Sequence, residues 1–193
     1  MVYRLARAFF KFYFKVFNRT RFKGLENAVT DGPLIVYANH FSDCDVFLIS
    51  AAFDRVIRFM AKKSLFETPV VRRAVKAYQA FPVDRDGNDI AAIKTAFKIL
   101  KSGGVLGIFP EGTRIRNGKV SDPKGGFAMI AYKTKTTVQP VHLKYKRKFL
   151  LFNSIDVIVG KPIKWDELGV TDATSEDYAK VSRELMEKVY SLE

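Results

Sequence analysis

Two side chains in one short loop have the types and the spacing for acid–base chemistry. Residues 39–45 read Asn-His-Phe-Ser-Asp-Cys-Asp, so Asp45 stands five positions after His40. Across a strand-to-helix turn, a carboxylate at this spacing can hold the imidazole in one tautomer, and the imidazole can then take the proton of a hydroxyl group. The loop therefore predicts a His–Asp general base that acts on a hydroxyl-bearing substrate.

Other roles for the same loop stay open on the residues alone. Ser42 and Asp45 also fit a helix-start box, in which Ser42 caps the helix and Asp45 is its third residue. Cys44 has the side chain of a nucleophile, although a small residue on a helix face is the simpler interpretation. The chain contains no Gly-x-Ser-x-Gly segment, which is the pattern of a serine nucleophile in hydrolases.

The elements that must position this loop alternate between strands and helices. Short apolar runs predict strands at 33–39, 57–61, 80–83, 104–109, 137–145 and 155–159. Helices are expected at 43–53, 65–78, from a cap at Asn88 to Gly103, at 124–133 and from Ser175 onward. Pro82 makes its short strand an edge or irregular one. This alternation predicts a single α/β domain over residues 20–193, with a mixed, largely parallel sheet flanked by helices.

In such sheets, ligands gather at strand ends. The loops after 33–39 and 104–109 are therefore the places to look for chemistry. The second of these loops reads Phe-Pro-Glu-Gly-Thr-Arg over residues 109–114.

Composition narrows the class of protein. The 193 residues are 48% hydrophobic, which supports a packed core and excludes a disordered chain. One cysteine and two histidines leave no material for a disulfide scaffold or for a Cys- or His-rich metal site. A net charge of +13 points to an anionic partner, such as nucleic acid, an acidic membrane, a phosphorylated substrate or an acidic carrier protein.

With these blocks in view, the sequence resembles the glycerolipid acyltransferase family, which includes bacterial 1-acyl-glycerol-3-phosphate acyltransferase. The family pattern Asn-His-x-Ser-x-x-Asp is present at 39–45, and Phe-Pro-Glu-Gly-Thr-Arg at 109–114 matches letter for letter. An Arg-bearing block ends at Arg85, and an apolar-Pro-apolar block follows at 138–141. The resemblance covers residues 20–142 and implies a glycerophosphate acyltransferase-like fold.

The resemblance also implies roles for particular residues. His40 and Asp45 would be catalytic, and Arg85 with the 109–114 block would hold the glycerol phosphate of the acceptor. The remaining phosphate-site candidates are Glu111, Gly112, Thr113, Arg114 and Lys124. Arginine suits this task because its planar fork meets phosphate oxygens bidentately. We hypothesise that the Gly112 N–H binds the oxyanion. Alternatively, Glu111 and Arg114 form a local ion pair that stiffens the turn.

The expected reaction moves a fatty acyl group from acyl-CoA or acyl-carrier protein to the free hydroxyl of 1-acyl-sn-glycerol-3-phosphate, which is lysophosphatidic acid. The product is phosphatidic acid, and the resemblance implies neither a metal nor a prosthetic group. Another lysophospholipid or lipid acceptor is the first alternative. A basic nucleic-acid-binding module is the second, but it leaves both sequence blocks without a purpose, and no nucleic acid is expected as a partner.

Residues 1–19 form a separate arm that is rich in aromatic and basic side chains. A helical projection places Arg4, Arg7, Lys11 and Lys15 in one stripe and, on the other side, Leu5, Phe9, Phe12, Tyr13, Val16 and Phe17. The arm is too short and too charged to span a bilayer. It is typical of an amphipathic helix in an anionic membrane interface, although a helix that packs its aromatic face on the core is also consistent. We expect a peripheral, monotopic protein on the cytoplasmic face of a membrane.

Overall fold

The computed structural model describes residues 2–84, 89–115, 120–146 and 154–193. The strands of its sheet are β1 (Arg21–Lys23), β2 (Leu34–Ala38), β3 (Ile57–Lys62), β4 (Phe81–Val83), β5 (Val105–Ile108), β6 (Thr137–Tyr145) and β7 (Ile155–Val159). The α-helices are α1 (Val2–Phe17), α2 (Asp45–Ala52), α3 (Pro69–Ala77), α4 (Ile90–Lys101), α5 (Gly126–Thr134) and α6 (Ser175–Ser191). Short 3-10 helices are η1 (Leu25–Asn27), η2 (Lys63–Phe66) and η3 (Trp165–Glu167).

The strands lie in the order β1-β7-β6-β2-β5-β3-β4, and the predicted mixed, largely parallel sheet is confirmed. Only the β6–β7 pair among these neighbours is antiparallel. The central strand β2 is buried along its whole length, which explains why it reads as an unbroken apolar run. Because Tyr37 of β2 pairs with Ile108 of β5, the two strands end side by side. The loops after β2 and β5 therefore begin at the same edge of the sheet.

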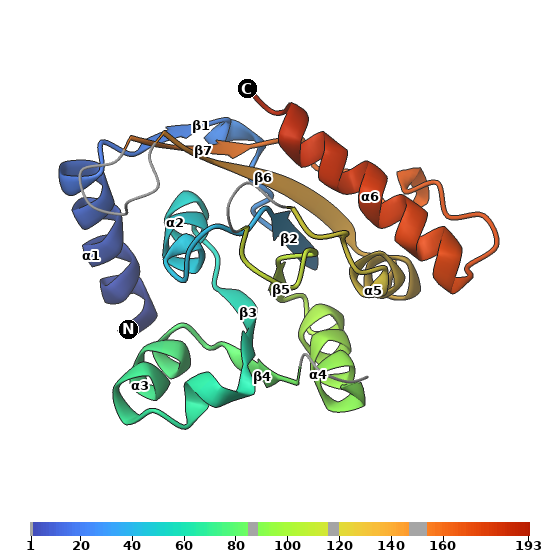
Figure 1. Cartoon of the computed structure of the whole chain (residues 1–193), viewed down its shortest axis with the longest axis horizontal. Coiled ribbons are helices and arrows are strands. Elements are labelled where there is room, and N and C mark those ends of the chain that lie inside the picture. Colours follow the sequence, from blue (N-terminus) through green and yellow to red (C-terminus); the bar gives the residue numbers. More distant parts are fainter. Residues whose placement is uncertain (1, 85–88, 116–119, 147–153) are drawn as a thin grey trace.

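Helices cover both faces of this sheet (Figure 1). On one face, α4, α5 and α6 contribute Leu100, Phe127 and Leu185 to a core built on alternate residues of β2 and β5. On the other face, α1 and α2 contribute Phe14 and Leu48 to a second core. The buried faces of these helices explain the apolar periodicity that predicted them.

The N-terminal helix α1 packs on α2 through a face that the sequence did not single out. Phe14 is fully buried, and the ring of Phe10 stacks on Phe47 of α2 with centroids 4.2 Å apart. Arg7, expected at a membrane surface, instead forms an ion pair with Asp54 at 2.8 Å and also donates to the Phe53 carbonyl. In the helical projection, Arg7 lies between the basic stripe and the buried ring of Phe14, and it therefore faces α2.

The opposite face of α1 remains exposed. Four apolar side chains at helical spacing have exposed fractions between 54% and 66%: Leu5, Phe9, Phe12 and Val16. Arg4, Lys11 and Lys15 are exposed beside them, and Tyr13 is half-buried. The helix thus packs one face on the core and turns another to solvent, and the membrane interpretation stays a prediction for the exposed face.

Several element boundaries differ from expectation. The helix expected over 65–78 is divided into η2 and α3, with Pro69 at the first position of α3, where a missing N–H costs nothing. Asp89 caps α4 by accepting a hydrogen bond from the Ala92 N–H, whereas Asn88 lies outside the described residues. Strand β4, with Pro82, is an edge strand as predicted. Strand β1 was missed because three residues are too few to show the alternation of apolar and polar side chains that predicts a strand.

Candidate active site

His40 and Asp45 face each other directly after β2. The Nδ1 atom of His40 lies 2.9 Å from Oδ2 of Asp45, and both residues are buried, with exposed fractions of 5% and 0%. An ionised carboxylate only accepts hydrogen bonds, so Nδ1 must carry the proton and Nε2 is the basic nitrogen. This is the arrangement that a general base requires.

The same carboxylate also holds the backbone of its loop. Oδ2 of Asp45 accepts hydrogen bonds from the N–H groups of Phe41 at 2.6 Å and Ser42 at 2.8 Å. Helix α2 begins at Asp45 itself, and the Ser42 hydroxyl accepts from the Cys44 N–H at 3.2 Å. The helix-start box is therefore half formed: the Asp45 carboxylate accepts from the Ser42 N–H, but the Ser42 hydroxyl bonds the Cys44 N–H in place of the Asp45 N–H.

Cys44 does not have the surroundings of a nucleophile. It is half-buried, and burial is the main cause that raises the pKa of its thiol, with the charges of Asp45 and Asp43 adding to the effect. A raised pKa keeps the thiol protonated and unreactive. The geometry favours Cys44 as a small packing residue.

Two residues that sequence reasoning missed complete the environment of His40. Phe109 stacks on the imidazole with ring centroids 4.0 Å apart and planes 14° apart. The Tyr145 hydroxyl donates a hydrogen bond to Oδ1 of Asp45. Phe109 belongs to the 109–114 block and was visible there, whereas Tyr145 is the last residue of the strand predicted at 137–145. Nothing in its local sequence marks it.

Glu111 is a buried carboxylate that contacts the other side of the His40 loop. Its exposed fraction is 2%, its Oε2 accepts from the His40 N–H at 3.3 Å, and its Oε1 accepts from the Tyr190 hydroxyl of α6. Burial raises the pKa of Glu111, and the two hydrogen bonds partly offset that shift. Glu111, expected to contact substrate phosphate, is therefore engaged in holding the backbone of His40.

The Glu111–Arg114 ion pair considered above does not form. Arg114 instead reaches back to the first loop, where its NH1 lies 2.6 Å from Oδ2 of Asp43. Burial separates the two partners: Glu111 points into the protein, whereas Arg114 and Asp43 are in contact with solvent. Arg114 remains at the surface of the site, where a phosphate can reach it.

The other candidates of the second loop lie close together. Gly112 adopts φ +68°, and a Cβ there would lie 3.3 Å from Cε of Lys124, which brings Lys124 to this turn. The Gly112 N–H donates to the Phe109 carbonyl at 3.0 Å, so the oxyanion role hypothesised for it is wrong in this conformation. The Thr113 hydroxyl is 3.0 Å from that of Ser121. Arg85 lies outside the described residues, although its neighbour Asp84 lines the adjoining pocket.

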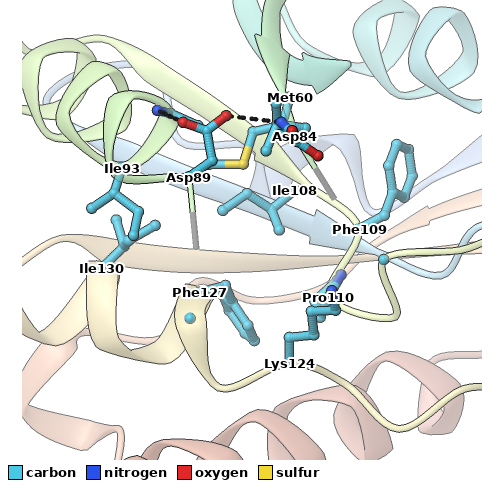
Figure 2. A pocket seen from close by; sticks show the side chains of 14 residues that line it. Met60, Asp84, Asp89, Ile93, Ile108, Phe109, Pro110, Lys124, Phe127 and Ile130 are labelled. Carbon is cyan, nitrogen blue, oxygen red and sulfur yellow. Dashed lines mark hydrogen bonds between the residues drawn. The ribbon is translucent and has the colours of Figure 1, made fainter. Parts of the chain in front are cut away.

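Two apolar pockets adjoin these loops, and Phe109 and Met60 line both. The first has a volume of about 210 Å³. It lies between α4 and α5, with Ile93 and Ile130 in its wall and Lys124 near its rim (Figure 2). The second, of about 290 Å³, is lined by His40 and by residues of α2, β3 and α3. The imidazole therefore sits beside apolar space on the side of α3.

Comparison with known proteins shows the family to which the chain belongs. Residues 19–144 match the family model described as Acyltransferase. The chain belongs to the acyltransferase family. This acyltransferase is 31% identical over 159 residues to the 1-acyl-sn-glycerol-3-phosphate acyltransferase of Bacillus subtilis, a match that covers 77% of the chain and 73% of that relative.

Two further similarities extend the comparison. The chloroplastic 1-acyl-sn-glycerol-3-phosphate acyltransferase LPAT1 of Arabidopsis thaliana is 28% identical over 158 residues, covering 76% of this acyltransferase and 44% of the plant protein. The crystal structure of the 1-acyl-sn-glycerophosphate (LPA) acyltransferase PlsC from Thermotoga maritima superposes with a TM-score of 0.72 at 26% identity. That superposition covers 98% of this acyltransferase and 77% of the PlsC chain, and it confirms the predicted fold class.

Proposed function

We propose that this acyltransferase moves a fatty acyl group from a thioester, either acyl-CoA or acyl-carrier protein, to the free hydroxyl of 1-acyl-sn-glycerol-3-phosphate. The observation that carries the proposal is the buried His40–Asp45 pair, whose Nε2 remains as a base next to apolar space. The relatives named above support the choice of acceptor, because they are 1-acyl-sn-glycerol-3-phosphate acyltransferases by name.

The chemical step follows from the tautomer of His40. Nε2 takes the proton of the acceptor hydroxyl while the oxygen of that hydroxyl forms a bond to the thioester carbonyl carbon. The tetrahedral intermediate then collapses, the carbon–sulfur bond breaks, and the imidazolium returns the proton to the leaving thiolate. The products are phosphatidic acid and a free thiol, and Asp45 stabilises the transient imidazolium throughout.

The acceptor phosphate needs cations at the surface of the site. Arg114 and Lys124 supply them in this proposal, with Thr113 as a neighbouring hydroxyl and Arg85 as a further candidate outside the described residues. For the phosphate to bind Arg114, it must displace or join Asp43, the present partner of the guanidinium. The apolar pockets on either side of Phe109 suit the acyl chains of the two substrates.

Helix α1 supports a peripheral position on an anionic membrane. No helix among the described residues is both long and apolar enough to cross a bilayer. The exposed stripe of Leu5, Phe9, Phe12 and Val16 has exposed Arg4, Lys11 and Lys15 along one side, as expected for a helix that lies in the lipid interface. In this position the membrane delivers a lipid acceptor to the site.

Vesicle sedimentation tests the membrane part of the proposal. Replacing both Phe9 and Phe12 by Ser should release the protein from vesicles that contain an anionic lipid, with little loss of folding stability because both rings are exposed. Phe14→Ala is the matched contrast on the same helix. It removes a buried ring and should destabilise the fold by about 3–5 kcal/mol. Vesicle binding by the double variant at the wild-type level would contradict this part.

A transfer assay with a radiolabelled acyl group tests the reaction itself. Each thioester donor is offered separately with lysophosphatidic acid, a lysophospholipid with a different headgroup or a lipid without phosphate. We expect labelled phosphatidic acid from the first acceptor and loss of turnover in His40→Ala. Equal turnover with the acceptor that lacks phosphate would contradict the proposed acceptor, and wild-type turnover in His40→Ala would contradict the mechanism.

A further inference from the structure

The carboxylate of Asp45 has a partner on each oxygen. Oδ2 carries the imidazole of His40 and two backbone N–H groups, as described above. Oδ1 accepts a hydrogen bond from the hydroxyl of Tyr145, the last residue of β6. Both oxygens are thus occupied, and rotation of the carboxylate away from His40 would break bonds on both sides.

The sheet brings Tyr145 to this position. Strand β6 runs parallel to β2 with Val141 opposite Ala38, so β6 continues beside the loop that follows β2. The Asn39 side chain prolongs this pairing, since its Oδ1 accepts from the Leu143 N–H at 2.8 Å and its Nδ2 donates to the Leu143 carbonyl at 3.0 Å. Two residues further along β6, the ring of Tyr145 packs against Phe41 with centroids 5.3 Å apart.

We propose that Tyr145 is a positioning residue of the catalytic pair, whose hydroxyl fixes the Asp45 carboxylate and thereby the orientation and basicity of His40. The proposal rests on the proposed function. Tyr145 lies just beyond the residues matched by the family model, 19–144. It acts only through Asp45 and lines neither of the two pockets beside the site.

The surroundings of Tyr145 make it a lasting donor. Burial is the main cause that raises the pKa of its phenol, and the negative charge of Asp45 raises it further. The hydroxyl therefore keeps its proton at neutral pH and stays a hydrogen-bond donor. A donor on Oδ1 disperses the charge of Asp45 and limits how strongly that charge favours a protonated imidazole.

The other titratable and charged groups near His40 and Asp45 have partners or charge states of their own. Cys44 at the start of α2 is neutral, because burial raises the pKa of its thiol. On the loop after β5, Glu111 faces the His40 backbone, and Arg114 is paired with Asp43. None of these side chains donates a hydrogen bond to Asp45 among the contacts of the described residues, so Tyr145 is the side chain whose removal changes Oδ1 directly.

The test compares two Tyr→Phe variants. Tyr145→Phe keeps the ring against Phe41 and deletes only the hydroxyl. Tyr37→Phe is the matched control. Its hydroxyl is buried on β2, the strand that precedes His40, and has no hydrogen-bond partner within the described part of the chain. The dependence of kcat/KM on pH, both KM values and the melting temperature are measured for each variant and for wild type.

We expect Tyr145→Phe to lower kcat by roughly tenfold at neutral pH with both KM values unchanged. The acid limb of its pH profile should move to higher pH by roughly half a unit, because Asp45 with one donor fewer stabilises the imidazolium more strongly. Tyr37→Phe should keep the wild-type profile. Because a fold defect would lower the amount of active enzyme without moving the pH profile, the profile separates positioning from stability.

The outcomes also separate this inference from the proposed function. If His40→Ala is inactive and Tyr145→Phe matches Tyr37→Phe in kcat and pH profile, the role of Tyr145 is overturned and the general-base mechanism stands. A loss of kcat without any movement of the acid limb would also overturn the role. If His40→Ala retains wild-type turnover, the proposed function itself falls.

Discussion

The loops after β2 and β5 meet at one edge of the sheet, but they treat their polar side chains differently. In the first loop, His40 and Asp45 are buried and their hydrogen bonds stay within the protein. In the second, the Arg114 side chain is 39% exposed and, within the described part of the chain, bound only to Asp43, whose side chain is 72% exposed. A buried network holds one geometry before substrate arrives, as proton transfer requires, whereas an exposed pair can exchange its partner for a ligand.

Each loop also contains one residue whose burial is typical of the other loop. Glu111 belongs to the second loop but is buried and holds the His40 backbone. Asp43 belongs to the first loop but is exposed and holds Arg114. If burial decides the role, Glu111 should affect turnover and Asp43 should affect acceptor binding, regardless of the loop that carries them.

The largest effect is expected from the buried pair. Asp45→Asn should lower kcat by about 10²–10⁴-fold with little change in either KM, because an amide cannot hold the same tautomer or stabilise the imidazolium. Steady-state kinetics with varied acceptor and donor measure the split. If Asp45→Asn kept a near-normal kcat and raised a KM instead, the proposed division between a loop for turnover and a loop for binding would be wrong.

Arg114→Ala should act next most strongly, and on binding. Loss of a charge-assisted contact to phosphate should raise the acceptor KM by about 10–100-fold while kcat changes little. Arg114→Lys, which keeps the charge but not the planar fork, is the matched control and should fall between. An unchanged acceptor KM in Arg114→Ala would show that the phosphate binds elsewhere.

Glu111→Gln tests whether the role of a residue follows from its burial rather than from the loop that carries it. The amide keeps an acceptor oxygen but has only one, so the side chain cannot accept from both the His40 N–H and the Tyr190 hydroxyl as it does now. We expect kcat to fall by roughly tenfold with the acceptor KM unchanged. Tyr190→Phe should show a weaker form of the same change. A rise in acceptor KM instead would return Glu111 to the phosphate site.

Asp43→Asn should give the smallest effect and the opposite sign. Removing the carboxylate frees Arg114 and takes a negative charge from the phosphate site, so the acceptor KM should fall by a few-fold with kcat unchanged. The effect should shrink as salt is added, since both side chains are exposed. A raised KM would mean that Asp43 orients Arg114 for the phosphate rather than competing with it.

The pairing of His40 with Asp45 could be predicted because its geometry is local. His40 and Asp45 are five residues apart, and a single strand-to-helix turn brings them together. Six of the seven strands of the sheet were also predicted closely, because buried strands are short apolar runs. The partners of the second loop could not be predicted in this way. The closeness of Glu111 and Arg114 in the sequence suggested an ion pair. In the structure, Glu111 instead contacts Tyr190, and Arg114 contacts Asp43.

The amino-acid sequence by itself determined the α/β architecture, the pairing of His40 with Asp45 and the acyltransferase family, since each depends on short patterns or on motifs read in order. Only the tertiary structure decided which face of α1 packs on α2 and which tyrosines reach the carboxylates of Asp45 and Glu111. Tyr145 lies 100 residues from Asp45, and Tyr190 lies 79 residues from Glu111. Such contacts depend on strand order and helix packing, which bring together segments that carry no sequence signal of one another.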